Sequence, residues 1–91
     1  MYIIDIIMNK YKLLQKIINN IKNVHFDEFI IVIEMFGFTL DRVNGSHHIF
    51  KKSGIPEIIN IQNVNGTAKP YQIKQFFAII EKYDIKLEDE L

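Results

Sequence analysis

Two short strand-like runs flank the dipeptide Asn44-Gly45, and this pattern predicts a β-hairpin. The first run covers residues 38–43 and the second covers residues 47–52. Asn-Gly between two such runs is a strong short-range hairpin signal, because both residues tolerate the positive φ angles of a tight turn. A third run, residues 57–62, predicts one more strand. The sequence therefore predicts an antiparallel sheet in the middle third of the chain.

An amphipathic pattern at the N-terminus predicts a helix ahead of the sheet. Its apolar residues alternate in steps of three and four, as in a heptad pattern: Ile4, Ile7, Tyr11, Leu14, Ile18 and Ile21. We interpret it as a helix packed on its own domain. The alternative is a coiled coil, and with it a homo-oligomer formed through this helix. A further alternative is that Met8 is the natural first residue and that the residues before it are an extension.

Two further helices are predicted, one on each side of the sheet residues. Residues 26–36 repeat apolar side chains at helical spacing, and Gly37 follows where a left-handed cap is expected. Pro70 suits the first turn of a helix, because its missing N–H is not needed there, and an apolar stripe continues to Tyr83. Without the N-terminal helix the order is α-β-β-β-α. We predict an α+β fold with a three-stranded antiparallel sheet and helices on one face.

Length and composition narrow the classes of protein that fit. With 91 residues the chain is expected to form one domain. It has no cysteine, which excludes disulfides and thiolate metal sites and favours a cytoplasmic location. Its three histidines lack the spacing of a metal motif, so we expect no metal and no cofactor. The apolar start is broken too soon, by Asp5, Asn9 and Lys10, to span a membrane.

Charge is unevenly distributed along a chain that is neutral overall. We divide the chain into a helical extension over residues 1–25, a domain over residues 26–83, and an acidic tail over residues 84–91 that we expect to be frayed or solvated. The zero net charge argues against a strongly electrostatic nucleic-acid binder. Residues 42–83 nevertheless carry a net charge of +4, whereas residues 23–41 carry −4. The predicted hairpin therefore extends into a locally basic segment.

Two histidines begin the second predicted strand, and alternation sends them to opposite faces. His48 shares a face with Phe50, the expected core residue, so we interpret His48 as a packing residue. His47 then faces outward with Lys51, where an imidazole beside a lysine is placed to meet a phosphate. A surface His47 without a function is the alternative.

Four short motifs follow one another in a specific order and spacing. They are Phe36-Gly37-Phe38, the run Asn-Gly-Ser-His-His-Ile-Phe at residues 44–50, Gly54-Ile55-Pro56, and the run Asn-Gly-Thr-Ala-Lys-Pro-Tyr-Gln-Ile-Lys-Gln at residues 65–75. From Phe26 to Tyr83 the chain resembles the HicA family of bacterial toxins. It is most similar to the longer HicA-like proteins with an extra N-terminal helical segment.

The resemblance implies a fold, an activity and a partner. HicA proteins are small ribonucleases that cleave messenger RNA and stop translation, with a fold like the double-stranded-RNA-binding domain. They are blocked by a partner antitoxin, HicB. The histidine of the family's Gly-Ser/Gly-His motif corresponds to His47. Many members carry a second histidine after the third strand, where this chain has Gln62-Asn63-Val64.

We therefore hypothesise that His47 is the general acid–base of a metal-free endoribonuclease. RNA contacts are assigned to the following residues: Arg42, Ser46, Lys51, Lys69 and Lys74. Lys51 is the best candidate to hold the scissile phosphate. Two alternatives stay open, a non-catalytic RNA-binding module of the same fold and a protein-interaction domain.

Overall fold

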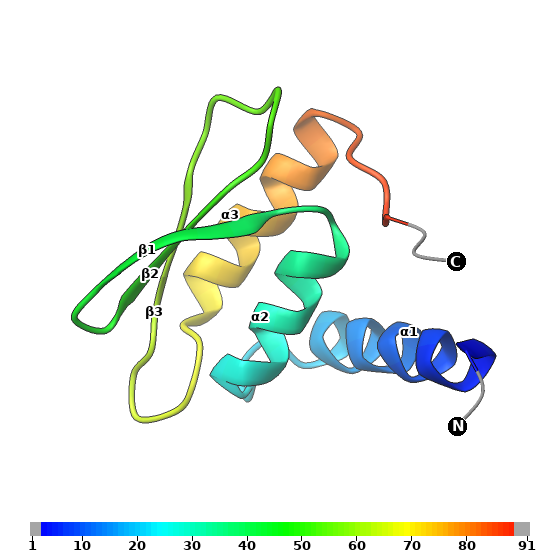
Figure 1. The fold of residues 1–91 in the computed structure, drawn as a ribbon. Coiled ribbons are helices and arrows are strands. Elements are labelled where there is room, and N and C mark those ends of the chain that lie inside the picture. The colour runs from blue at the N-terminus through cyan, green and yellow to red at the C-terminus, as the bar shows by residue number, and fades with distance from the viewer. Residues whose placement is uncertain (1–2, 89–91) are drawn as a thin grey trace.

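The computed structural model describes residues 3–88, with the side chains of the first helix described from Met8 onward. The elements are, in chain order, α1 (Ile3–Asn19), α2 (Phe26–Met35), β1 (Thr39–Asn44), β2 (His47–Lys51), β3 (Ile59–Gln62) and α3 (Pro70–Lys82). The strands form one antiparallel sheet in the order β1-β2-β3. Figure 1 shows α2 and α3 on the same side of this sheet, and α1 against α2. The predicted α+β fold, α-β-β-β-α with an additional N-terminal helix, is confirmed.

The hairpin forms where it was predicted, but its turn lies one residue later than Asn44-Gly45. Asn44 is the last residue of β1 and pairs with His47, so Gly45 and Ser46 are the two turn residues. Gly45 has a φ of +59°, and glycine at the first turn position is what a type II′ turn requires. This turn places His47 at the first position of β2.

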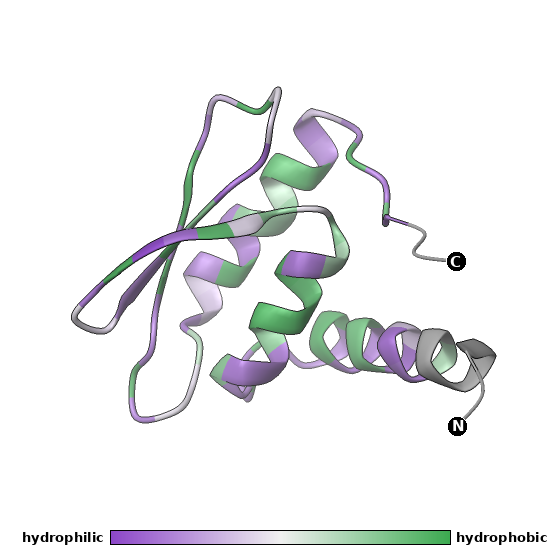
Figure 2. Ribbon diagram, viewed as in Figure 1, coloured by the Kyte–Doolittle hydropathy of each residue, from purple (hydrophilic) through white to green (hydrophobic). Residues whose placement is uncertain are grey.

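The main core lies between the sheet and the two helices that cover it. Phe76 of α3 is at its centre, with 1% of its surface exposed. Its ring lies 5.5 Å from that of Phe29, 5.6 Å from that of Phe38 and 5.8 Å from that of Phe36, between centroids. Figure 2 shows that α2, which meets both α3 and α1, is largely hydrophobic. Edge-to-face aromatic packing of this kind adds to the burial of apolar surface.

The face of α1 that packs on α2 differs from the predicted heptad face. Leu14 and Ile17 are buried in the core, with Ile17 only 1% exposed. Tyr11 and Ile18 belong to the predicted face but are about half exposed, at 47% and 50%. A straight helix has 3.6 residues per turn, whereas the heptad pattern has a period of 3.5 residues. The buried stripe of a single packed helix therefore drifts away from the heptad positions. The predicted positions Ile4 and Ile7 have side chains outside the described residues.

The segment that follows α3 is packed rather than solvated in its first part. Ile85 and Leu87 are partly buried against the core. The backbone N–H of Glu88 donates to the carbonyl of Met35 at the end of α2. The other predicted tail residues, 89–91, lie outside the described residues. The apolar residues Ile85 and Leu87 explain the difference, because their burial outweighs the solvation of the acidic residues beside them.

The β2–β3 loop is fastened to the end of α3 by one carboxylate. Glu57 accepts hydrogen bonds from the Tyr83 hydroxyl and from the Lys82 ammonium, at 2.5 and 3.0 Å. The hydrogen bond from Tyr83, and then that from Lys82, holds the pKa of the Glu57 carboxyl below its ordinary value of 4.5. A carboxylate with a lowered pKa stabilises the fold above the unfolded-state value, and this contribution is lost as pH falls through the folded-state value.

Replacing Glu57 with glutamine is therefore expected to make the free energy of unfolding less dependent on pH in the acidic range. The variant should be less stable than the parent chain at neutral pH, and the two should converge as pH falls below about 4.5. Urea denaturation on both sides of that pH measures this difference. Parallel curves for the two chains would show that Glu57 contributes nothing through its charge.

Candidate nucleic-acid interface

The sheet face opposite the helices carries a short row of polar side chains around one buried residue. Ile49 of β2 pairs with Arg42 of β1 on one side and with Asn60 of β3 on the other. His47 and Lys51 flank it along β2. Ile49 is only 5% exposed, although it lies on the open face, because these four side chains lie around it in the sheet. The open face therefore presents an imidazole, an amide and two cations around the apolar side chain of Ile49.

The His47 ring is held by a side chain of the neighbouring strand. Its Nδ1 atom lies 3.0 Å from Oδ1 of Asn60. His47 is directly opposite Gln62 and therefore diagonal to Asn60, a separation that a side chain of this length spans. His47 is half-buried, and its ring lies on the side of the sheet that no helix covers.

His48 packs on the opposite side, as predicted. Its ring meets the ring of Phe26 edge-on, with centroids 4.7 Å apart. Its Nδ1 atom is buried and has no hydrogen-bond partner within the described residues. His48 is therefore part of the packing between the sheet and α2.

Arg42 and Lys51 converge on an acidic residue that sequence analysis did not single out. The register of β1 shifts between Leu40 and Arg42, and this irregularity leaves Asp41 as the additional residue. Asp41 lies 2.5 Å from the Arg42 guanidinium and 3.5 Å from the Lys51 ammonium. The hydrogen bond from Arg42 lowers the pKa of the Asp41 carboxyl below its ordinary value of 3.8. Asp41 is thus ionised at neutral pH and offsets part of the positive charge of these two cations.

The other predicted RNA contacts lie at the turn and at the start of α3. The Ser46 hydroxyl accepts a hydrogen bond from the Gln62 amide at 3.4 Å. Lys69 immediately precedes α3 and Lys74 is exposed on its second turn, so both belong to the helical layer rather than the open face. Beside them Tyr71 is 52% exposed, with the Lys69 ammonium 5.8 Å from its ring centroid. The structure therefore brings Arg42 and Lys51 to the sheet face of His47, and places the other two lysines on a different layer.

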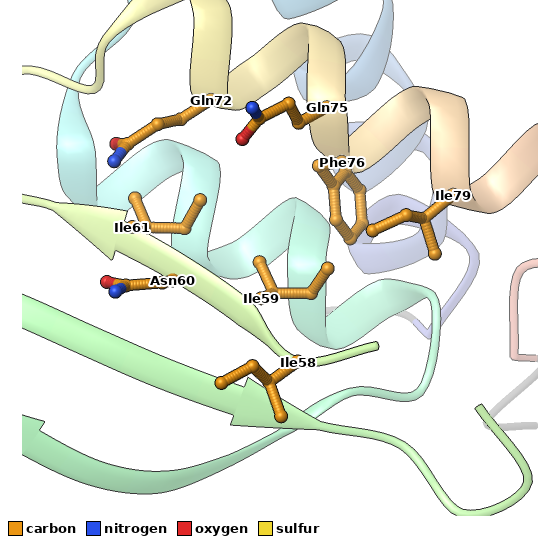
Figure 3. Close-up of a pocket in the computed structure, with 8 residues that line it drawn as sticks. All are labelled: Ile58, Ile59, Asn60, Ile61, Gln72, Gln75, Phe76 and Ile79. Atoms are coloured by element: carbon orange, nitrogen blue, oxygen red, sulfur yellow. The ribbon is translucent and has the colours of Figure 1, made fainter. Parts of the chain in front are cut away.

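A hollow between β3 and α3 is too small for a nucleotide or another organic substrate. It measures about 30 Å³ and is lined by Ile58, Ile59, Asn60, Ile61, Gln72, Gln75, Phe76 and Ile79, which suits a water molecule. Figure 3 shows Ile59 and Ile61 on the α3 side of the strand and Asn60 on the other side. Among the described side chains, those of residues 8–88, no three His, Asp or Glu residues gather into a metal site. None of the described helices combines the length and apolar character needed to cross a membrane.

Residues 26–82 match the family model described as the HicA toxin of bacterial toxin–antitoxin systems. The chain belongs to the HicA toxin family. No curated protein and no solved structure matched the chain. The matched region begins with α2 and ends with α3, so the HicA region is the α-β-β-β-α unit and α1 precedes it.

Three residues of this HicA surface escaped the sequence analysis. Asn60 and Asp41 acquire their roles from the strand register, which residue spacing alone does not define. Tyr71 lies within a quoted motif, and an aromatic residue two positions after Lys69 is the signal that could have marked it as a candidate for base stacking.

Proposed function

We propose that this HicA protein is the toxin of a type II toxin–antitoxin pair and acts as a metal-independent endoribonuclease on messenger RNA. The observation that carries the proposal is the placement of His47. Its imidazole lies on the same open sheet face of a HicA domain as Arg42 and Lys51, where a polynucleotide backbone can reach it. RNA provides both the nucleophile and the leaving group of the reaction, so one proton-transfer residue and a phosphate site are sufficient.

The proposed reaction is an internal transesterification. The His47 imidazole takes the proton from a ribose 2′-hydroxyl, whose oxygen attacks the adjacent phosphorus. The bond from phosphorus to the 5′-oxygen breaks, and that oxygen receives a proton from solvent. The products are a 2′,3′-cyclic phosphate and a 5′-hydroxyl. Lys51 stabilises the charge that develops on the phosphoryl oxygens.

Arg42, Ser46, Lys69 and Lys74 are assigned to the RNA backbone outside the scissile bond. Lysine and arginine contacts with phosphates are independent of sequence and weaken with salt. The Ser46 hydroxyl already accepts a hydrogen bond from Gln62, and its own proton can be donated to a phosphate oxygen. Because Lys69 immediately precedes α3 and Lys74 lies on it, they serve a segment of RNA that has left the sheet face.

Cleavage of a defined RNA by the purified protein in the presence of a chelator tests the proposal. We expect 2′,3′-cyclic phosphate and 5′-hydroxyl ends, and no cleavage of the same RNA with a 2′-deoxyribose at the cleaved position. RNA that is bound but stays intact would instead support the non-catalytic RNA-binding module. A chain that binds a HicB-type antitoxin but no RNA at low salt would support the protein-interaction domain.

Replacing Asp41 with asparagine is expected to strengthen RNA binding. The change removes the carboxylate that pairs with Arg42 and Lys51, so both cations become available to phosphates. We expect affinity at low salt to rise about tenfold and the salt dependence of log K to steepen by about one to two. Titration of the protein into labelled RNA at several salt concentrations measures both values.

The matched control for this change is Asp84→Asn, which alters net charge equally. Asp84 pairs with Lys86 beyond α3, remote in sequence from the hairpin. Equal gains in affinity for the two variants would show that overall charge matters and that the Asp41 contacts do not.

A HicB-type antitoxin is the proposed protein partner, and the cytoplasm, where messenger RNA is translated, is the proposed location. We expect the antitoxin to cover the sheet face around His47, because access of RNA to this face is what it has to prevent.

Self-association through α1 also stays a prediction. Of the predicted heptad residues whose side chains are described, Tyr11 and Ile18 are exposed and available for such a contact.

A further inference from the structure

We infer that Asn60 is a positioning residue for His47, and that it holds the ring in the tautomer whose Nε2 atom exchanges the proton with RNA. The inference rests on the proposed function of His47 and adds a residue from a different strand. Asn60 Oδ1 and His47 Nδ1 are 3.0 Å apart. An amide oxygen is only an acceptor, so with Oδ1 facing the ring we assign the hydrogen to Nδ1, which donates it. Nε2 is then the basic nitrogen of the neutral ring.

This hydrogen bond is compatible with both protonation states that catalysis needs. In the neutral ring Nδ1–H donates to Asn60, and Nε2 is ready to accept the 2′-hydroxyl proton. In the protonated ring both nitrogens carry hydrogen, and the same bond to Oδ1 persists. The ring therefore need not rotate when it gains or loses the proton. A group that keeps its geometry through a proton transfer lowers the reorganisation that the reaction requires.

The strand register explains why this residue occupies the position. Ile49 pairs with Asn60 and is 5% exposed, so the backbone at this point of β2 and β3 is anchored by packing. Asn60 lies on the side of β3 away from α3 (Figure 3), and thus on the face of His47. A side chain held by a sheet strand is placed more accurately than one on a loop.

The orienting group is neutral, which distinguishes this pair from a histidine held by a carboxylate. The Asp41 carboxylate of β1 is bound to Arg42 and Lys51, and the hydrogen-bond contact of the His47 ring is with the Asn60 amide. Asn60 therefore selects the tautomer without adding a negative charge beside the phosphate. A carboxylate at this position would repel the RNA backbone and would favour the protonated ring.

Three variants test the inference. Asn60→Ala removes the acceptor, Asn60→Asp retains an acceptor but adds charge, and Ile58→Ala is the control, because Ile58 precedes β3 and is 47% exposed. For each, nitrogen-15 NMR of the histidine rings reports which His47 nitrogen carries hydrogen, and cleavage kinetics report kcat and KM. These readouts separate positioning from a general loss of structure, which thermal denaturation monitors.

We expect Asn60→Ala to give a mixture of His47 tautomers and to lower kcat about tenfold with little change in KM, the effect of one lost hydrogen bond. Asn60→Asp should restore the single tautomer and move the pH–rate profile to higher pH. Ile58→Ala should change neither the His47 tautomer nor the cleavage kinetics. An unchanged tautomer in a folded Asn60→Ala variant would overturn the inference and leave the role of His47 standing. Unimpaired cleavage by folded His47→Ala would instead overturn the proposed function, whatever the NMR result.

Discussion

Replacing His47 with alanine is expected to lower the rate of RNA cleavage by about 10²–10⁴-fold, the usual contribution of a general acid–base group. The fold should survive, because His47 is half-buried and lies on the open face, outside the main core. RNA binding should change little, since the assigned cations are intact. Single-turnover cleavage and binding titrations of the same preparation separate these two effects.

The other two histidines supply matched controls for this variant. His25→Ala removes an exposed imidazole that precedes α2, so cleavage should be unchanged. His48→Phe retains an aromatic ring against Phe26 and should also retain cleavage, because His48 packs on the helical side. Equal losses of rate in the His47 and His48 variants would contradict the assignment of roles by strand face.

Signals that act within a few residues predicted most of the fold correctly. The hairpin, the cap at Gly37 with its φ of +88°, and the start of α3 at Pro70 were all predicted. Each depends on the conformational preference of one or two residues and is insensitive to the rest of the chain. The opposite orientations of His47 and His48 follow from strand alternation, another local rule.

Features that depend on contacts between distant residues could not be predicted in this way. Ile17 rather than Ile18 faces α2, because the packing of two helices selects the buried stripe of α1. The contact of Asn60 with His47 requires the register of β3, and the residues from Glu57 to Ile58 that were predicted as strand belong to a loop. The pairing of Asp41 with Arg42 depends on a register shift within β1.

Replacing Phe76 with alanine is expected to be the most destabilising single change in the chain. Truncation of a buried phenylalanine costs about 3–5 kcal/mol, whereas a small domain has a total stability of about 5–15 kcal/mol. Phe76 is 1% exposed and contacts the rings of Phe29, Phe36 and Phe38, so the cavity would lie between both covering helices. Urea denaturation followed by circular dichroism measures the loss.

Phe77→Ala is the control, because Phe77 is the next residue of α3 but is only partly buried. The loss of stability should be clearly smaller than for Phe76→Ala, because the Phe77 side chain buries less apolar surface on folding and its removal leaves a cavity that opens toward solvent. Under conditions that unfold Phe76→Ala, cleavage and RNA binding should be lost together, because unfolding removes the sheet face as a whole. His47→Ala should lose cleavage alone. A Phe76→Ala variant as stable as Phe77→Ala would contradict the central position of Phe76, and cleavage lost at full stability would indicate that α3 takes part in the chemistry.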